Sequence, residues 1–400
     1  MLYWLGELLK YNLYGPFRLL TSHLVLMALG TLGAGFMVWF FLPRWKGTLP
    51  RDRGKALVKD GQKSAGKPTG AGYWLTLIIL PVMFLCVPLS EAWDAGIYIC
   101  IFLAMFTGYL DDKSATPWGE WRKGLCDLGI AFLTALFLCK IQTTGFECCV
   151  EGEPYSNFKH DWVFFHSYRL EDVVMWLPFT KESFTVSWQL YLPMATVLLW
   201  FTVNATNCSD GVDGLAGSLT LIALVSLAAL LYGIVGYKPV AEYLLIPHSP
   251  AGARWAILLF TAVGGLAGYL WYNAEPSTLL MGDAGSRMLG LLVGIGVLAS
   301  GNPLLVFVVS PVILANGGAG ICKLVLLRVL KRLGLDTTPP DKGRVDDQHA
   351  LVRALHSVRF PLHDHCRRNL GWSNAQVLMR FMLIQAFLTP ILFILFIKIR

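Results

Sequence analysis

The feature that most constrains this chain is a series of apolar runs close to the length that crosses a lipid bilayer. One membrane-spanning helix needs about 20 predominantly apolar residues. Ten such runs occur, at residues 22–42, 74–90, 94–110, 124–142, 188–203, 214–237, 253–272, 287–301, 303–328 and 376–398. The runs are continuous, whereas a membrane β-barrel alternates apolar and polar residues over segments of about ten. The sequence therefore predicts an all-α, polytopic integral membrane protein with about ten transmembrane helices.

Composition agrees with this class. Only 15% of the 400 residues are charged and 55% are hydrophobic, whereas soluble domains are about a quarter charged. No linker and no repeat divides the chain, so residues 1–400 are expected to form one membrane-embedded domain. The net charge of +7 is attributed mainly to topology, with part of it available for anionic lipid or phosphate, and no nucleic-acid partner is expected.

Basic residues predict the orientation. Loops 43–73 and 331–375 are rich in Lys and Arg, whereas loop 143–187 has only Lys159, Arg169 and Lys181 beside a larger number of acids. By the positive-inside rule the two basic loops are cytoplasmic. An even number of spans then places both termini on the outer, periplasmic side.

Three polar motifs interrupt the apolar chain, each at the end of a predicted span and on the side of the basic loops. The first ends in Asp111-Asp112. Two adjacent carboxylates can divide a task, one accepting a proton while the other orients a cation. An acidic pair that merely ends a helix at the interface is the alternative, so this motif alone is a weak signal.

The second motif, residues 204–214, carries four amides and acids: Asn204, Asn207, Asp210 and Asp213. Their i, i+3 spacing predicts one face of a helical turn, and oxygen ligands of this type suit Mg²⁺. The alternative is an Asn/Asp-rich cap for the helix that begins near residue 214. One residue suffices for a cap, so four exceed that need.

The third motif contains Asn273 and then Asp283, which is followed by Gly285 and Ser286. Asp283 is either a helix cap or a Mg²⁺ ligand beside a phosphate held at a helix N-terminus. A fourth segment, His363-Asp364-His365, lies among arginines in the second basic loop. Three interpretations remain open: a diphosphate contact, metal binding by the two histidines, although zinc sites usually have more ligands, and a solvated loop.

The order of these motifs resembles the polyprenyl-phosphate N-acetylhexosamine-1-phosphate transferases. Asp-Asp, Asn-x-x-Asn-x-x-Asp-Gly-x-Asp-Gly, Met-Gly-Asp-x-Gly-Ser and Pro-Leu-His-x-His before Gly371-Trp372 occur in sequence, and residues 66–72 resemble the family's glycine-rich stretch. The similarity runs from about residue 44 to the C-terminus. It is strongest to the phospho-N-acetylmuramoyl-pentapeptide transferase branch.

The resemblance implies a Mg²⁺-dependent transfer of phospho-MurNAc-pentapeptide from UDP-MurNAc-pentapeptide to undecaprenyl phosphate, giving lipid I and UMP. It implies a bacterial inner membrane location, contact with membrane lipid, an active site on the cytoplasmic face and a homodimer. Asp111 and Asp112 match the acidic pair, and Asp283, with Asp210, is the expected Mg²⁺ site. The wider set expected to bind substrate is Asn204, Asn207, Asp210, Asp213, Asn273, Lys123, either Lys63 or Lys67, His363 and His365.

The chain departs from the family pattern in three places. A usual lysine is replaced by Ala115, near which Lys113 is a candidate substitute, and the second of three histidines is replaced by Asp364. One extra residue separates that segment from Gly371. These changes affect the expected nucleotide contacts and leave the acidic set complete.

Three other functions remain open. A sibling enzyme would transfer GlcNAc-1-phosphate or another sugar phosphate to the same lipid. A transporter or channel would place its acids near mid-span, whereas here they gather at one face. A non-catalytic relative would explain Asp364. If the protein is a transferase, two mechanisms remain open: direct transfer and a two-step route through an Asp nucleophile.

Overall fold

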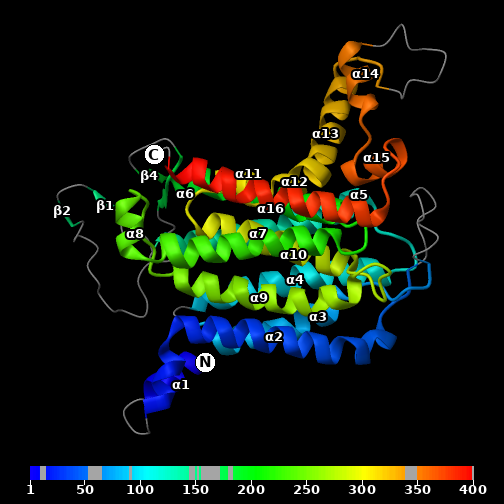
Figure 1. Cartoon of the computed structure of the whole chain (residues 1–400). Coiled ribbons are helices and arrows are strands. Elements are labelled where there is room, and N and C mark those ends of the chain that lie inside the picture. Colours follow the sequence, from blue (N-terminus) through cyan, green and yellow to red (C-terminus); the bar gives the residue numbers. More distant parts are fainter. Residues whose placement is uncertain are drawn as a thin grey trace.

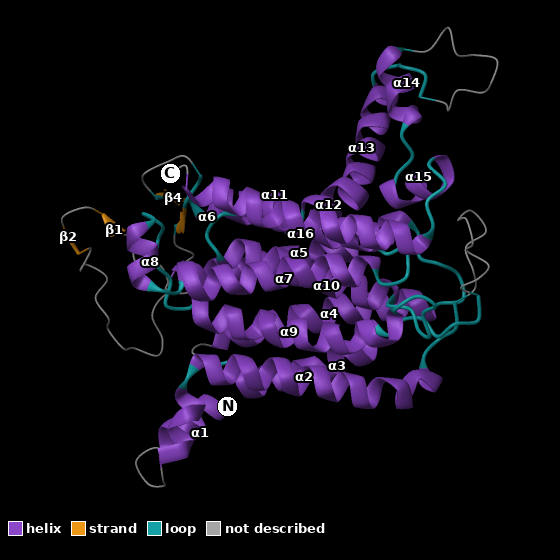
Figure 2. Cartoon of the chain, viewed as in Figure 1, coloured by secondary structure: helices purple, strands orange, loops and turns teal. Residues whose placement is uncertain are grey.

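The computed structural model describes residues 1–9, 15–52, 65–89, 92–143, 149–150, 153–154, 172–178, 183–337 and 349–398. Lys63 and most of loop 143–187 lie outside these residues. Long helices running side by side dominate the described part (Figures 1 and 2). The prediction of an all-α, polytopic membrane protein is therefore confirmed.

Every predicted span overlaps a helix. These are α2 (His23–Trp45), α3 (Gly72–Cys86), α4 (Ala92–Lys113), α5 (Glu120–Thr143), α6 (Trp188–Ser209), α7 (Leu215–Leu230), α9 (Gly252–Asn273), α10 (Gly282–Ala299), the segment from α11 to α13, and α16 (Asn374–Lys398). Within the described residues, eight helical segments are long and apolar enough to cross a membrane. The helix α3 is shorter and α6 is more polar at its end, so the count of ten spans stays a prediction.

Smaller elements complete the chain. They are α1 (Leu2–Leu9), α8 (Lys238–Tyr243), α14 (Ala350–Ser357), α15 (Leu362–Asn369), the 3-10 turns η1 (Gly15–Thr21), η2 (Lys46–Thr48) and η4 (Pro303–Leu305), and the π-helical turn η3 (Leu231–Val235). Two short antiparallel pairs, β1 (Cys149–Val150) with β2 (Glu153–Pro154) and β3 (Val173–Met175) with β4 (Phe184–Val186), lie between α5 and α6.

Glycines let the helices approach closely. A Cβ at Gly264 of α9 would overlap the carbonyl oxygen of Thr31 in α2, and one at Gly290 of α10 would lie 2.6 Å from the carbonyl oxygen of Thr202 in α6. Close backbone approach through small residues is how helices associate in membranes, where burial from water gives no driving force. The glycine-rich patch at residues 264–268 therefore serves close helix packing.

The span predicted at residues 303–328 is broken. It consists of α11 (Val306–Val309), α12 (Pro311–Ile313), a π-helical turn η5 (Leu314–Gly318) and α13 (Ala319–Arg332). Pro311 cannot continue the hydrogen bonds of the preceding turn, and a π turn bends the helix axis. As a result α13 leaves the bundle at an angle, with α14 at its far end and α15 beside its base (Figure 1).

The two termini lie at the same end of the bundle (Figure 1). Because successive long helices run in opposite directions, the ends of α4, α6 and α9 and the starts of α5, α7 and α10 gather at the other end. All four polar motifs lie there, as expected. Which membrane face each end meets stays a prediction.

Candidate functional site

A charged cluster occupies this end of the bundle. Asp111 lies in the last turn of α4, and Asp283 is the second residue of α10. Both carboxylates contact the Lys123 ammonium of α5, at 3.0 Å for Asp283. The backbone N–H of Trp118 donates to Asp111 Oδ1 at 2.8 Å, whereas Lys123 contacts the other oxygen, Oδ2. Three residues that the sequence predicts for the site, Asp111, Asp283 and Lys123, are therefore in contact.

Asp112 caps the N-terminus of α10. The sequence had left this capping role open for Asp283. Its carboxylate accepts hydrogen bonds from the backbone N–H groups of Asp283 and Ala284, both at 3.1 Å. An anionic side chain at these first amides stabilises the start of α10. A Cβ at Gly108, on the facing turn of α4, would overlap the Asp283 carbonyl. The glycine permits the approach, and the Asp283 carboxylate is left to face Lys123.

Two further charged residues belong to the cluster. Arg287, one turn after Asp283, has a side chain only 1% exposed, with Nη2 at 3.1 Å from Asp283 and 3.8 Å from Asp111. Its Nη1 lies 3.2 Å from Asp127 of α5. Neither residue was predicted from the sequence. Their position at or inside predicted apolar runs could have identified them, because an ionised group needs a partner there.

A second patch adjoins the cluster through the glycine-rich stretch. Lys67 donates to Ser277 Oγ at 3.0 Å and lies 3.5 Å from Asp213 Oδ2, which also accepts from the Ser277 N–H at 3.2 Å. The N–H of Leu280 donates to the carbonyl of Pro68 at 2.7 Å. Of the two candidate lysines, Lys67 lies in this patch, whereas Lys63 lies outside the described residues.

Asn273 joins two turns. Its Oδ1 accepts from the N–H of Gly214 at 2.8 Å, and its Nδ2 donates to the carbonyl of Leu279 at 2.9 Å. Gly214 has a φ of +77°, which favours glycine. The buried amide thus ties the turn before α7 to the loop before α10.

The second motif is not one helical face. Helix α6 ends at Ser209, and α7 begins at Leu215, so the prediction of one continuous face is wrong for Asp210 and Asp213. Asn204 lies with the charged cluster and Asp213 with the second patch. Asn204 donates to the Trp200 carbonyl at 2.9 Å and lies against Asp127.

The remaining members lie at the end of α6. The backbone carbonyl of Asn207, a half-buried residue, accepts from the Asp210 N–H at 3.1 Å. The carboxylates of Asp210 and Asp213 both lie close enough to the buried Tyr269 to interact with it electrostatically. Metal binding by Asp210 stays a prediction.

His363 meets the second motif from α15. The backbone N–H and Nδ1 of this buried residue lie 2.8 and 3.1 Å from Oδ1 of Asn316, in the π-helical turn η5. An amide oxygen only accepts, so Nδ1 carries the proton and Nε2 of the neutral ring is an acceptor. A Cβ at Gly211 would overlap Nε2. The sequence analysis did not find Asn316, whose only signal is a polar residue within an apolar run.

The departures from the family pattern are accommodated locally. Asp364 lies 3.0 Å from Arg368 Nε and 3.9 Å from Arg359. Nδ1 of His365 accepts from the Arg359 N–H at 3.2 Å. Lys113 lies over the Tyr109 ring, 6.0 Å from its centroid. The added negative charge is therefore offset by neighbouring arginines.

The carboxylates of the cluster suit Mg²⁺ in number and kind. Among the residues that the structure describes, no three His, Cys, Asp or Glu side chains are grouped so as to hold a metal. Two carboxylates, Asp111 and Asp283, do contact one common cation, the Lys123 ammonium. Mg²⁺ commonly binds one or two carboxylates and takes its other ligands from water and substrate phosphates. The cluster fits such an ion.

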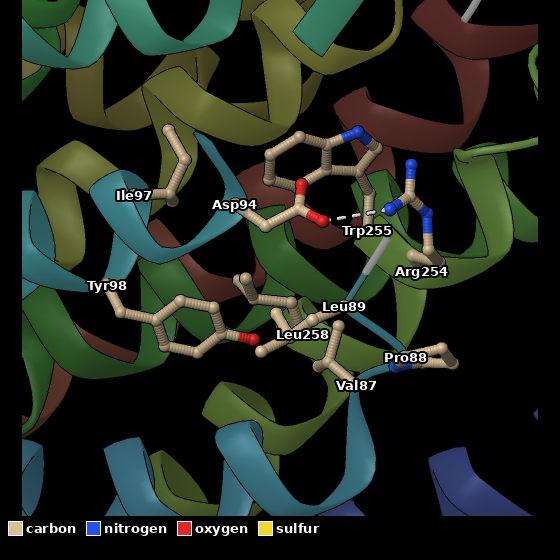
Figure 3. A pocket seen from close by; sticks show the side chains of 9 residues that line it. All are labelled: Val87, Pro88, Leu89, Asp94, Ile97, Tyr98, Arg254, Trp255 and Leu258. Carbon is tan, nitrogen blue, oxygen red and sulfur yellow. Dashed lines mark hydrogen bonds and ion pairs between the residues drawn. The ribbon is translucent and has the colours of Figure 1, made fainter. Parts of the chain in front are cut away.

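A surface pocket lies away from this cluster (Figure 3). It is formed where α3 ends and where α4 and α9 begin, with the ion pair of Asp94 and Arg254, 3.0 Å apart, beside Tyr98 and Trp255. These elements meet at the end of the bundle that carries the termini. The pocket therefore contributes nothing to the acidic cluster.

Comparison with known proteins decides the family. Residues 95–301 match the family model described as glycosyl transferase family 4. A phospho-N-acetylmuramoyl-pentapeptide-transferase of Treponema pallidum (strain Nichols) is 43% identical, over 94% of this chain and 91% of the relative. This chain belongs to the phospho-N-acetylmuramoyl-pentapeptide transferase family. The resemblance inferred from the motifs is confirmed, and the protein is a phosphotransferase.

More distant members of the phospho-N-acetylmuramoyl-pentapeptide transferase family match over similar lengths. The relative from Koribacter versatilis is 27% identical, with 95% of both chains covered. The relative from Bartonella quintana is 26% identical, with 88% of both chains covered. With its apolar helices, the chain is a multi-pass membrane protein of this family.

The double hydrogen bond of Asn273 leads to a prediction about stability. Asn273→Ala leaves the buried Gly214 N–H and Leu279 carbonyl without their partner, so we expect a loss of about 2 kcal/mol. Thermal unfolding in detergent should show a lower Tm. Asn207→Ala, at a half-buried position, serves as the control and should lower Tm less; an equal decrease would contradict the role of Asn273.

Proposed function

We propose that this protein transfers phospho-MurNAc-pentapeptide from UDP-MurNAc-pentapeptide to undecaprenyl phosphate, with Mg²⁺ as cofactor, giving lipid I and UMP. The observation that carries the proposal is the convergence of Asp111 and Asp283 on one cation, the Lys123 ammonium. Membership of the transferase family supports the choice of substrates. The polar end of the bundle faces the cytoplasm in this proposal, and both termini face the periplasm of a bacterial inner membrane.

In the proposed reaction an oxygen of the lipid phosphate attacks the sugar-linked phosphorus. The bond from that phosphorus to the bridging oxygen breaks, and UMP leaves with the bond's electrons. Asp111 and Asp283 would hold Mg²⁺, which supplies neutralisation of the diphosphate and of the leaving oxygen when it is bound. Positioning and electrostatics supply most of the catalysis in such a transfer.

The chain's other residues have roles that follow from charge and position. Lys123, half-buried between two carboxylates, offsets the charge of the reacting phosphates, and Asp111 orients the lipid phosphate. Lys67, Asp213 and His363 contribute to donor binding. The neutral His363 ring offers an acceptor at Nε2 and would donate there only when it is protonated. A single transferase domain and assembly as a homodimer are part of the same proposal.

The direct test is release of UMP by the purified protein. The enzyme in detergent–lipid micelles is given undecaprenyl phosphate, Mg²⁺ and UDP-MurNAc-pentapeptide, with UDP-GlcNAc in a parallel reaction. Release with the muramoyl donor alone, abolished by EDTA, is the expected result. Release with UDP-GlcNAc alone would assign the protein to the sibling activity. No release with either donor would support a non-catalytic relative.

The local pairing of Asp364 predicts that its charge matters little to the donor. Asp364→Asn removes an i, i+4 ion pair with Arg368, a type worth about 0.3–0.5 kcal/mol. We expect KM for the UDP donor to change by less than about threefold, since about 1.4 kcal/mol corresponds to tenfold. A tenfold change would mean that Asp364 acts on the donor directly.

A further inference from the structure

The buried pair of Arg287 and Asp127 has no role in the reaction as proposed above. Both side chains are almost fully enclosed, at 1% and 3% exposure. Placing two charges in such surroundings is costly, and a buried ion pair is seldom favoured for stability alone. A well-packed apolar pair would fill the same space, so the guanidinium requires another explanation.

The contacts of Arg287 indicate what it does. The guanidinium is a planar fork with donors in fixed directions. One end, Nη1, is held by Asp127 at 3.2 Å, and the other, Nη2, meets Asp283 at 3.1 Å and Asp111 at 3.8 Å. Asp127 thus orients the arginine, and the arginine orients the two carboxylates that face Lys123.

Lys123 and Arg287 contact the same two acids but differ in freedom. The Lys123 side chain is 30% exposed and can withdraw its ammonium toward solvent, whereas Arg287 is enclosed at 1%. If Asp111 and Asp283 hold Mg²⁺, the Lys123 ammonium could give up its place beside the carboxylates, whereas the enclosed Arg287 guanidinium could not. Arg287 would then support the two carboxylates from behind.

We propose that Arg287, anchored by Asp127, is a positioning residue that fixes the Asp283 and Asp111 carboxylates for Mg²⁺. This inference rests on the metal role in the proposed function. Groups that orient metal ligands through hydrogen bonds change metal affinity by about 10–100-fold when they are removed. The same magnitude is expected here, without any direct contact between Arg287 and the ion.

The test separates geometry from charge. Arg287→Lys keeps the charge but loses the fork, and the double variant Asp127→Asn/Arg287→Gln keeps the net charge while removing the pair. Binding of Mn²⁺ in place of Mg²⁺ is followed by electron paramagnetic resonance in the presence of UMP, without turnover. We expect both variants to weaken Mn²⁺ binding by about 10-fold or more.

The ion pair of Asp94 and Arg254 in the pocket provides a matched control for the Arg287 variants. Asp94 and Arg254 are also separated by 160 residues and form an ion pair at 3.0 Å (Figure 3). They lie where α4 and α9 begin, at the other end of the bundle (Figure 1). Arg254→Lys and Asp94→Asn/Arg254→Gln should leave Mn²⁺ affinity unchanged, while Tm reports any general loss of stability in either set.

Two outcomes would overturn the inference, and they differ. Unchanged Mn²⁺ affinity in the Arg287 variants, with normal binding by the unmodified protein, would refute the positioning role and leave the proposed function intact. Absence of Mn²⁺ binding by the unmodified protein would refute the metal role itself, and the inference with it.

Discussion

Asp283→Asn is expected to abolish Mg²⁺-dependent turnover, lowering kcat by about a thousandfold or more, while the protein still folds and inserts. A metal ion supplies several kcal/mol of charge stabilisation in the transition state, and each 1.36 kcal/mol is a factor of ten in rate. The fold should survive because the N-terminus of α10 is capped by Asp112 rather than by Asp283. Arg287 would also keep its partner Asp127.

Two measurements check this prediction, UMP release across a Mg²⁺ titration and Tm in the same micelles. Asp364→Asn makes the identical chemical change outside the cluster and should retain turnover. Near-normal activity of Asp283→Asn at ordinary Mg²⁺ concentrations would remove Asp283 from the metal role. A large fall in Tm would instead show that its carboxylate is needed for the fold.

Gly72→Ala is expected to destabilise the fold strongly, although it adds only a single methyl group. A Cβ at Gly72 would overlap the backbone N and Cα of Gly285 in α10. A side chain could relieve such an overlap by changing its rotamer, but backbone atoms cannot. Overpacking of this kind costs about 1–3 kcal/mol, and occasionally more. The start of α3 would have to separate from α10, weakening the hydrogen bond that the Gly72 N–H donates to the Met281 carbonyl at 3.1 Å. Turnover should fall together with Tm.

Gly129→Ala is the control for this change. Gly129 lies within α5 with nothing near the position of a new Cβ, and alanine favours helix over glycine by about 1 kcal/mol. Its Tm should stay equal or rise slightly. If Gly72→Ala also kept the normal Tm and turnover, the tight approach of α3 to α10 would be refuted.

The fold was predictable from the sequence because a bilayer imposes strong requirements. Each crossing must satisfy its own backbone hydrogen bonds over a fixed thickness, so the apolar runs mark the helices directly. The bend before α13 coincides with Pro311 and the π-helical turn η5 that follows it. The end of α6 was less visible, since Asn207 and Asp210 have a helical spacing although the helix stops at Ser209.

The site was predictable only in part. Acids flanked by glycines showed which segments meet, because such residues have few uses at a membrane boundary. Their division of tasks depends on contacts between distant residues. Nothing near Asp112 in the chain indicates that it caps the helix of Asp283, 171 residues later, and Arg287 finds Asp127 across 160 residues. Pairings over such separations leave no local pattern.

The cap on α10 has a consequence for how the protein is made. Asp112 and Asp111 are adjacent, yet the amides that hold Asp112 belong to Asp283 and Ala284. During synthesis α4 is made long before α10. Asp111 and Asp112 are therefore in place before the α10 residues that contact them. A chain interrupted before residue 283 therefore lacks the amides that hold Asp112, however well its first helices have inserted. If the proposed function is correct, phosphate transfer would begin only after α10 has joined the bundle.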